Sequence, residues 1–529
     1  MDHSPKVELK VPKRSGFDKS FQNLLTTKVG TLTPLLVDEL IPNSSVDLSS
    51  VVSASLPPLA SDTFMRCNLK LEAFFVPKRL LYGGFEDWLT GNKAYDGNDS
   101  DYVSVCRPIL RVTYSQAAQT ALLAPGTLAD YLGYRRFSAN PSGTAEFNIE
   151  PFLAYHRIYD DWYRNTLVQA PVFARPVSGA GGDLFNLPYT FLPSTGYYTL
   201  VGTFADGVAL GALRQRNFGL DYFTAALPQE QLGSAKKVGF NTSGATGEFT
   251  IAALRMANSL QQFAERNQLA GYRLQDYVKA NYGADLSNGV AQRTIYLGSA
   301  EIPVYSKGVY SNSLGTSGSQ ATNNPFSKVI GSEFGSAECS GSASLVHDFT
   351  AQEPGYLFVM GSLVPVVTYS SGIDRILHRY NVENSQTDMA TPLLQNVGNQ
   401  PIYQFELAEQ NMVNLNAFGY TDRYADFKNN MHDQLHGLVR DGQSLASFAL
   451  QRTITGTPQI NSSFLQIPTN YMDGVTAVTA DVSTYGVWID AFFKYGVSMP
   501  LAEYAIPSLQ DPAYEHGDSV HISVGGSRL

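Results

Sequence analysis

Residues 63–91 hold the most regular alternation of apolar and polar side chains in the sequence. The apolar positions of this stretch are Cys67, Leu69, Leu71, Ala73 and Phe75. Polar residues occupy the positions between them, and a period of two is that of a strand with one buried face. The stretch therefore predicts a central strand that ends at Pro77, which lacks a backbone N–H. Beyond it, Lys78 and Arg79 turn the chain outward into a short amphipathic helical turn at residues 85–89.

A stretch near the end of the chain repeats this pattern. Its apolar positions are Tyr485, Val487, Ile489, Ala491 and Phe493. Further strand-like runs cover residues 29–40, 294–304 and 355–369. Because strands contributed by both ends of a chain are common in double-sheet jelly rolls, we predict a mainly β scaffold of this kind. Long loops between the strands would then carry the protein's identity.

Two segments show helical spacing instead. The first follows Pro151 and repeats aromatic residues at Phe152, Tyr155, Tyr159, Trp162 and Tyr163, which predicts a helix with one buried aromatic face. The second runs from Thr250, a capping residue, to Gly271, a typical stop, and a further helical turn follows it. The apolar stripe of the second segment is Leu254, Ala257, Leu260 and Ala264.

Two other segments have the composition of loops. Residues 171–249 contain repeated Gly, Pro, Ser and Thr clusters between short strand-like pieces, which indicates a large insertion. Residues 311–344 are rich in Gly, Ser and Asn. Because such a composition offers little apolar surface to bury, we predict that this segment is a mobile surface loop.

The composition favours a protein that acts through its surface. Only 16% of the 529 residues are charged, whereas 12% are aromatic, including 30 Tyr and 29 Phe. Surfaces of this kind are typical of protein interfaces, and sugar-binding surfaces resemble them. The formal net charge of −10, from 37 basic and 47 acidic residues, argues against a protein that binds duplex nucleic acid through a broad basic face. A local basic patch remains compatible with it.

The cysteines and the N-terminal sequence bear on where the protein folds. Cys67, Cys106 and Cys339 are far apart in sequence, which indicates reduced, structural thiols. The N-terminal residues contain no apolar signal region, and no run of 18 apolar residues occurs. We therefore expect a protein that is made and folded in the cytoplasm without a membrane span.

Residues 1–16 form a polar segment that we interpret as an extended arm. Its basic residues are Lys6, Lys10, Lys13 and Arg14, and it holds few acidic ones. One interpretation is a solvated tail. The other is an arm that contacts nucleic acid or a neighbouring subunit through these four side chains.

Motifs of catalysis and cofactor binding are missing from the sequence. It contains no nucleophile elbow, phosphate-binding loop, HExxH zinc motif or paired cysteine ligands. His156 and Asp160 lie one helical turn apart, but without a third ligand structural pairing on a packed helix is favoured. His432 and His436 have the same spacing and also lack a third ligand. Residues 92–101 look like a calcium loop but have Asp101 where such a loop requires Gly. We predict no catalytic, cofactor or metal residues, although a cation bound between subunits or to a genome stays open.

Several short motifs, taken in order, resemble those of one family across nearly the whole chain. They are RSGFDKS from Arg14, TTKVGTLTPLLVDELIP, LEAFFVPKRLLYGGFEDWLTG, PFLAYHRIYDDWYRN, DYFTAALPQEQ, the segment 250–283 and FGYTDRYADFKN. Their combination resembles the major capsid protein of microviruses, in the form found in gokushoviruses and their relatives. Apart from DYFTAALPQEQ, the segments 171–249 and 311–344 match none of the family's motifs.

The resemblance implies a structural protein and no enzyme. It implies an eight-stranded antiparallel jelly roll with long helix- and loop-containing insertions, many copies of which form a T=1 icosahedral shell around circular single-stranded DNA of a tailless bacteriophage. We expect one capsid domain, divided into an arm (1–16), jelly-roll strands with a helical insert (17–170), a variable insertion (171–249), a helical segment with a strand (250–310), a surface loop (311–344) and the remaining strands with a helical insert (345–529).

The implied partners are other copies of the chain, the packaged single-stranded DNA, a basic DNA-binding peptide, a minor pilot or spike protein, a scaffolding protein and a bacterial receptor. The expected location is the virion, after assembly in the host cytoplasm. Because an acidic shell protein cannot neutralise DNA alone, further cations should accompany the genome. The main alternative is a carbohydrate-binding jelly roll or glycoside hydrolase, since paired carboxylates are recognised by distance in space and not by sequence. A host-recognition spike is a third reading.

Overall fold

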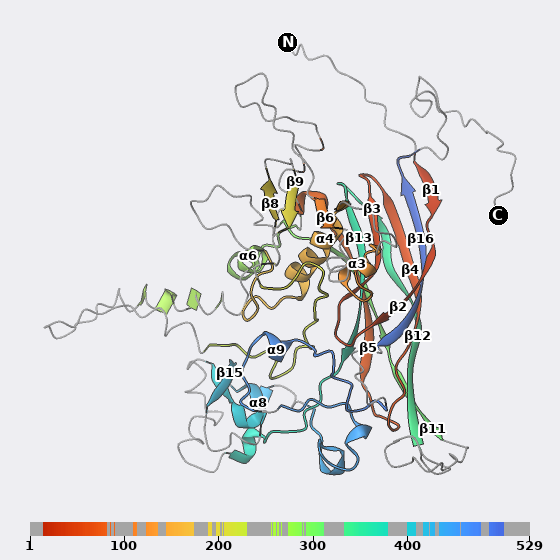
Figure 1. Cartoon of the computed structure of the whole chain (residues 1–529). Coiled ribbons are helices and arrows are strands. Elements are labelled where there is room, and N and C mark those ends of the chain that lie inside the picture. The colour runs from red at the N-terminus through yellow and green to blue at the C-terminus, as the bar shows by residue number, and fades with distance from the viewer. Residues whose placement is uncertain are drawn as a thin grey trace, which may run out of the picture.

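The structure is a computed structural model of the whole chain, and its centre is a sandwich of two antiparallel sheets (Figure 1). It describes residues 14–81, 109–113, 123–135, 144–173, 189–192, 197–200, 206–229, 273–287, 292–310, 333–378, 399–408, 416–422, 424–428, 433–454, 456–477 and 486–501, with isolated residues between these ranges. Everything below concerns these residues.

The first sheet has six strands in the order β1-β16-β4-β12-β11, and β2 also pairs with β16. These strands are β1 (Ser15–Asp18), β2 (Phe21–Thr27), β4 (Ser45–Ser55), β11 (Tyr305–Tyr310), β12 (Glu333–Thr350) and β16 (Val487–Met499). The second sheet has four strands in the order β10-β5-β13-β3. They are β3 (Thr33–Leu40), β5 (Cys67–Pro77), β10 (Ile295–Pro303) and β13 (Gly355–Pro365).

The strand order is that of a jelly roll. β16 lies between β2 and β4 in one sheet, while β13 lies between β3 and β5 in the other. Strands β2 to β5 alternate between the sheets, as do β12, β13 and β16, and these late strands return beside the early ones, as two Greek keys require. The predicted antiparallel jelly roll is confirmed. Its first sheet is wider than four strands because β11 adds a strand beside β12, while β1 continues the edge formed by β2 along β16.

The central strand predicted from the sequence is β5. All five of its alternating apolar side chains are buried between the sheets, in one core with residues of β4, β13 and β16. Val487, Ile489, Ala491 and Phe493 enter the same core from β16, as predicted, and Tyr485 lies outside the described residues. Two strands with a period of two therefore supply opposite walls of the sandwich core.

The four-stranded sheet is buried on its outer face as well. Helix α4 (Glu150–Ile158) begins with Pro151 in its first turn and continues into a π-helical turn at Tyr159–Tyr163. Phe152 and Tyr155 of this helix pack with Phe74 of β5 and Phe358 of β13 in a second core. The predicted aromatic helix and its buried face are confirmed.

An ion pair anchors this helical layer to the sheet. The Arg216 guanidinium donates to both carboxylate oxygens of Glu72 on β5, over 3.1 Å to Oε1. The Tyr163 hydroxyl donates to the same carboxylate over 2.5 Å. Both charged side chains are about 15% exposed. Because the pair is largely removed from water, the loss of one partner leaves a buried charge without compensation.

Shorter elements surround the sandwich. They are β6 (Ile109–Thr113), α3 (Leu128–Tyr131), β7 (Thr144–Asn148), β8 (Tyr189–Leu192), β9 (Tyr197–Leu200), α6 (Leu274–Tyr282), β14 (Gln400–Tyr403), β15 (Ala417–Thr421), α8 (Ala425–Lys428) and α9 (Ser462–Leu465). Single 3₁₀ turns span Lys78–Leu80, Arg375–His378, Gln404–Glu406, Gly437–Val439 and Ala446–Phe448. In Figure 1 the labelled helices lie on the side of the four-stranded sheet, away from the outer face of the six-stranded one.

The prediction of a surface loop over residues 311–344 is wrong in its second part. Residues 333–344 belong to β12, which pairs with β11 on one side and β4 on the other. Ala337 and Cys339 are buried in the sandwich core, while Ser336, Glu338 and Ser340 are exposed on the other face. Small residues fit here because β12 obtains its stability from pairing with two strands. Residues 311–332 lie outside the described part.

Two further segments of the predicted structure are described only in part. The chain is expected to turn outward at Lys78 and Arg79, and a 3₁₀ turn begins there, with the Lys78 ammonium group buried between the carboxylates of Glu39 and Glu150. The 250–271 segment is described only at a few positions, all of them helical and exposed. Among them is Leu260, at 43% exposure, so this member of the predicted apolar stripe is not buried within the chain. The other three members lie outside the described residues.

A third, smaller core joins α9, β14 and β15 to the segment around Phe223. The Glu406 carboxylate is buried beside it. It accepts a hydrogen bond from the Tyr403 N–H at 2.8 Å and one from the Tyr222 hydroxyl at 3.3 Å, and Arg375 Nη1 lies 3.8 Å away. Burial raises the pKa of Glu406 to about 7, although the Arg375 guanidinium opposes this shift.

We predict that Glu72→Ala lowers the free energy of unfolding by about 3–5 kcal/mol, because Arg216 loses its carboxylate while remaining buried. Urea titration of the purified chain measures this loss. Lys70→Ala on the same strand is the matched control, since the Lys70–Glu301 pair is half-exposed and should contribute less than about 1 kcal/mol. Equal losses in the two variants would contradict the anchoring role.

We also predict that Glu406 makes stability depend on pH. Its pKa is higher in the folded chain than the unfolded value of about 4.3, so the folded state binds the proton more tightly. This contribution to the free energy of unfolding is fully present below pH ~4.3 and falls as the pH rises to about 7. Urea titrations across this range should show a smaller slope for Glu406→Gln. The control Glu353→Gln should keep the parent slope, and an unchanged slope in Glu406→Gln would refute the assignment.

Candidate assembly and nucleic-acid surface

The structure places the predicted arm at the edge of the six-stranded sheet. Lys6, Lys10 and Lys13 lie outside the described residues. Arg14 is exposed directly before β1, and its guanidinium donates to the Ser498 carbonyl of β16 over 3.5 Å. β1 pairs with the end of β16, from Ser15 opposite Met499 to Asp18 opposite Gly496. Ser15 and Gly16, the last two residues of the predicted arm, are therefore part of this sheet, and Arg14 lies beside it.

The outer face of this sheet is exposed across β2, β16, β4 and β12, and we call it the open face. Four large apolar side chains are exposed on it: Leu24 at 71%, Val51 at 54%, Trp488 at 51% and Phe492 at 45%. Sequence reasoning did not single out these residues. Because side chains of β16 alternate between the two faces of the sheet, Trp488 and Phe492 lie on the face opposite the buried residues. This alternation is the sequence signal that could have identified them.

The strand registers place these side chains in rows. Trp488 is flanked by Thr26 and Ser55, Asp490 by Leu24 and Ser53, and Phe492 by Gln22 and Val51. The next strand adds Glu338, Ser340 and Ser342 to the same three rows. Because paired residues on one face lie close enough to touch, the apolar side chains form one patch set among hydroxyl groups.

The charged side chains in and next to these rows are Glu338, Asp490 and Lys494. The Gln22 side-chain amide donates to Asp490 Oδ1 over 2.8 Å, and the ammonium group of Lys494 is exposed one row further along β16. At the margin, the pKa of the Asp18 carboxyl is lowered by hydrogen bonds from the Ser20 hydroxyl and N–H. An exposed patch of large apolar side chains rimmed by polar residues is typical of an interaction surface.

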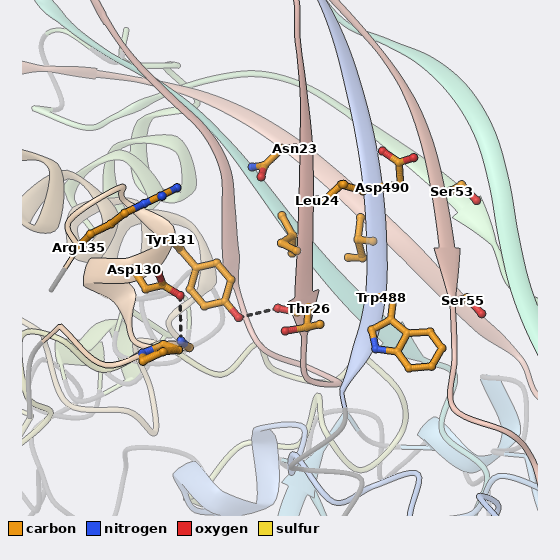
Figure 2. Close-up of a pocket in the computed structure, with 14 residues that line it drawn as sticks. Asn23, Leu24, Thr26, Ser53, Ser55, Asp130, Tyr131, Arg135, Trp488 and Asp490 are labelled. Atoms are coloured by element: carbon orange, nitrogen blue, oxygen red, sulfur yellow. Dashed lines mark hydrogen bonds between the residues drawn. The ribbon is translucent and has the colours of Figure 1, made fainter. Parts of the chain in front are cut away.

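A hollow of about 690 Å³ lies where the open face meets the segment around α3. Figure 2 shows Trp488 and Leu24 on the sheet side of this hollow and Arg135 on the side of α3. The Tyr131 hydroxyl donates to the Thr26 carbonyl over 2.5 Å, and the Gly126 N–H donates to the Asp130 carboxylate over 3.0 Å. These bonds fix the wall that carries Arg135, whose side chain is exposed.

The candidate residues for chemistry have structural roles. The Arg214 side chain donates to Nδ1 of His156, whose Nε2 must then donate to the Leu210 carbonyl, 2.9 Å away. Burial, with the Arg214 charge, holds the pKa of His156 well below its ordinary value, so this ring is neutral. Asp160 pairs with Arg164 at 2.5 Å and not with His156. Both residues therefore have structural partners, but the predicted pairing of His156 with Asp160 is wrong.

The remaining candidates offer no site within the described chain. His436 is exposed, and its predicted companion His432 lies outside the described residues, as do Cys106 and the loop 92–101. Cys67 and Cys339 are buried free thiols. Among the described residues no cluster of His, Cys, Asp and Glu could hold a metal ion. None of the described helices is both long and apolar enough to cross a membrane.

Comparisons with known proteins agree with this arrangement. The model of the family described as capsid protein (F protein) matches residues 6–246 and 240–509. The chain is 25% identical to capsid protein VP1 of Bdellovibrio phage phiMH2K, with 94% of this chain and 95% of the relative covered. It is 24% identical to capsid protein VP1 of Chlamydia phage 1 and 22% identical to that of Spiroplasma virus 4, again over at least 94% of both chains. The chain belongs to the capsid protein (F protein) family of phages, as a structural component of the virion and not an enzyme.

Proposed function

We propose that copies of this chain assemble into a T=1 icosahedral shell that encloses a circular single-stranded DNA genome of a tailless bacteriophage. Membership of the capsid family carries the proposal. The sandwich supports it, because one sheet is covered by the chain's own insertions while the open face has no such cover among the described residues. Closed symmetry would hide contact surfaces that a single copy exposes.

The charge of the chain limits how the genome is held. With a net charge of −10, the shell cannot neutralise the DNA phosphates alone. We propose that a basic DNA-binding peptide or small cations supply the balance, and that a pilot or spike protein and a scaffolding protein complete the particle. Assembly would take place in the host cytoplasm.

We further propose that Lys6, Lys10, Lys13 and Arg14 place the arm against the DNA. Arg14 supports this, because it lies beside the end of β16 and so joins the arm to the sheet that carries the open face. Lysine and arginine side chains gain affinity for a strand mainly through release of its counterions, which requires no base recognition.

The first prediction from this function concerns assembly. Electron microscopy of the expressed chain with circular single-stranded DNA should show uniform small icosahedral particles, and nuclease treatment should leave the enclosed DNA intact. Particles that form but never protect DNA would refute the genome assignment. A chain that stays monomeric at every ionic strength, with scaffolding protein present, would refute the shell itself.

The second prediction concerns the arm. Replacing Lys6, Lys10, Lys13 and Arg14 together by Ser should reduce the amount of protected DNA per particle and flatten its dependence on salt, because fewer counterions are released. A control that replaces Lys236 and Lys237, a basic pair within the predicted insertion 171–249, by Ser should retain the parent values. Unchanged DNA retention in the arm variant would mean that the arm does not contact the genome.

A further inference from the structure

We infer that the hollow at the edge of the open face binds nucleotides of a single DNA strand, with a base stacked on the indole of Trp488 and a phosphate paired with the guanidinium of Arg135. The inference rests on the proposed function, since it names the part of the chain that would contact the packaged strand. Both groups line the same hollow of about 690 Å³.

The aromatic side chains carry the first step of the argument. Trp488 and Phe492 are about half-exposed on the same side of β16, and four residues of strand separate them by about 13 Å. Aromatic rings presented on an open sheet are the usual platforms for the bases of single strands, because every base has a π face. Leu24 and Val51 continue the apolar surface beside the two rings.

Arg135 carries the second step. Its side chain is exposed on the opposite wall of the hollow, and within the described part of the chain it has no ion pair. A free guanidinium matches the geometry of a phosphate group. Ser53 and Ser55 of β4 also line the hollow, beyond Trp488 as seen from Arg135, and their hydroxyl groups can bond to the sugar or to a neighbouring phosphate.

The carboxylate of Asp490 sets the orientation of the bound nucleotide and the preference for one base over another. Its Oδ1 is occupied by Gln22, while Oδ2 has no hydrogen-bond partner among the described residues. A carboxylate repels phosphate but accepts hydrogen bonds from exocyclic amino groups, as Asp does from cytosine N4. The base should therefore lie toward Asp490 and the phosphate toward Arg135. Cytosine should bind better than thymine, which has no amino group.

The same charges favour DNA over a second copy of the chain as the occupant. A packed protein interface is poor in charge at its centre, because each buried charge must be desolvated and paired. The hollow contains the charged side chains of Arg135, Asp130 and Asp490 close to Trp488. A nucleotide supplies an anion for the guanidinium and amino groups for the carboxylate, whereas an apolar protein surface supplies neither.

The test uses the fluorescence of Trp488 in the full-length chain, obtained as the difference between the parent and Trp488→Phe. Titration with oligo(dC) and oligo(dT) should quench this emission, and oligo(dC) should bind more tightly. Trp488→Ala should weaken binding about 10-fold, as expected for the loss of one stacked base. Arg135→Gln should reduce the slope of log affinity against log salt by about one. Tyr305→Ser is the matched control, since this tyrosine is exposed on the same sheet outside the hollow, and it should change neither value.

The outcomes separate this inference from the proposed function. Particles that protect DNA while the emission of Trp488 stays that of the free chain would overturn the inference and leave the function standing. A change in that emission on assembly without DNA would overturn it in favour of a subunit contact. Quenching by oligonucleotides in a chain that never forms particles would support the inference and remove the shell proposal.

Discussion

The burial of β13 on both faces is the constraint on which the rest of the molecule depends. Leu357, Val359 and Leu363 face the other sheet, whereas Phe358 and Met360 face the helical layer around α4. A strand of this kind cannot stay in water on either side. The insertions must therefore cover the four-stranded sheet, and the Glu72–Arg216 pair holds them there. The six-stranded sheet is left as the one with an open face.

Close approach between the sheets explains why small residues recur on strands of the sandwich. A Cβ at Gly298 of β10 would lie 2.2 Å from the Leu345 carbonyl oxygen of β12, and one at Gly341 of β12 would lie 3.0 Å from the Ile302 side chain. The two strands belong to different sheets, so glycine lets the sandwich narrow along this side. The Gly and Ser content that made β12 look like a loop is thus partly a packing requirement.

The sequence predicts those elements whose signal is local. β5 and β16 alternate strictly, and α4 repeats aromatic residues at helical spacing, so all three could be located in advance. β12 could not, because its small side chains carry little hydrophobic signal and its partners β4 and β11 define it. The burial of Lys78 depends on Glu150, and the hollow depends on Arg135 meeting Trp488 across 353 positions. Contacts between residues so far apart in sequence are set by the topology of the fold, which no local sequence pattern encodes.

The position of β16 between β2 and β4 has a consequence for biosynthesis. The ribosome synthesises β2 and β4 hundreds of residues before β16. Until β16 is made, the edges of β2 and β4 that pair with it remain unpaired. Truncated polypeptides that stop before Val487 would lack the strand that joins β2 to β4. Such fragments would fold poorly and would not assemble. The fold therefore favours incorporation of chains that have been translated through β16.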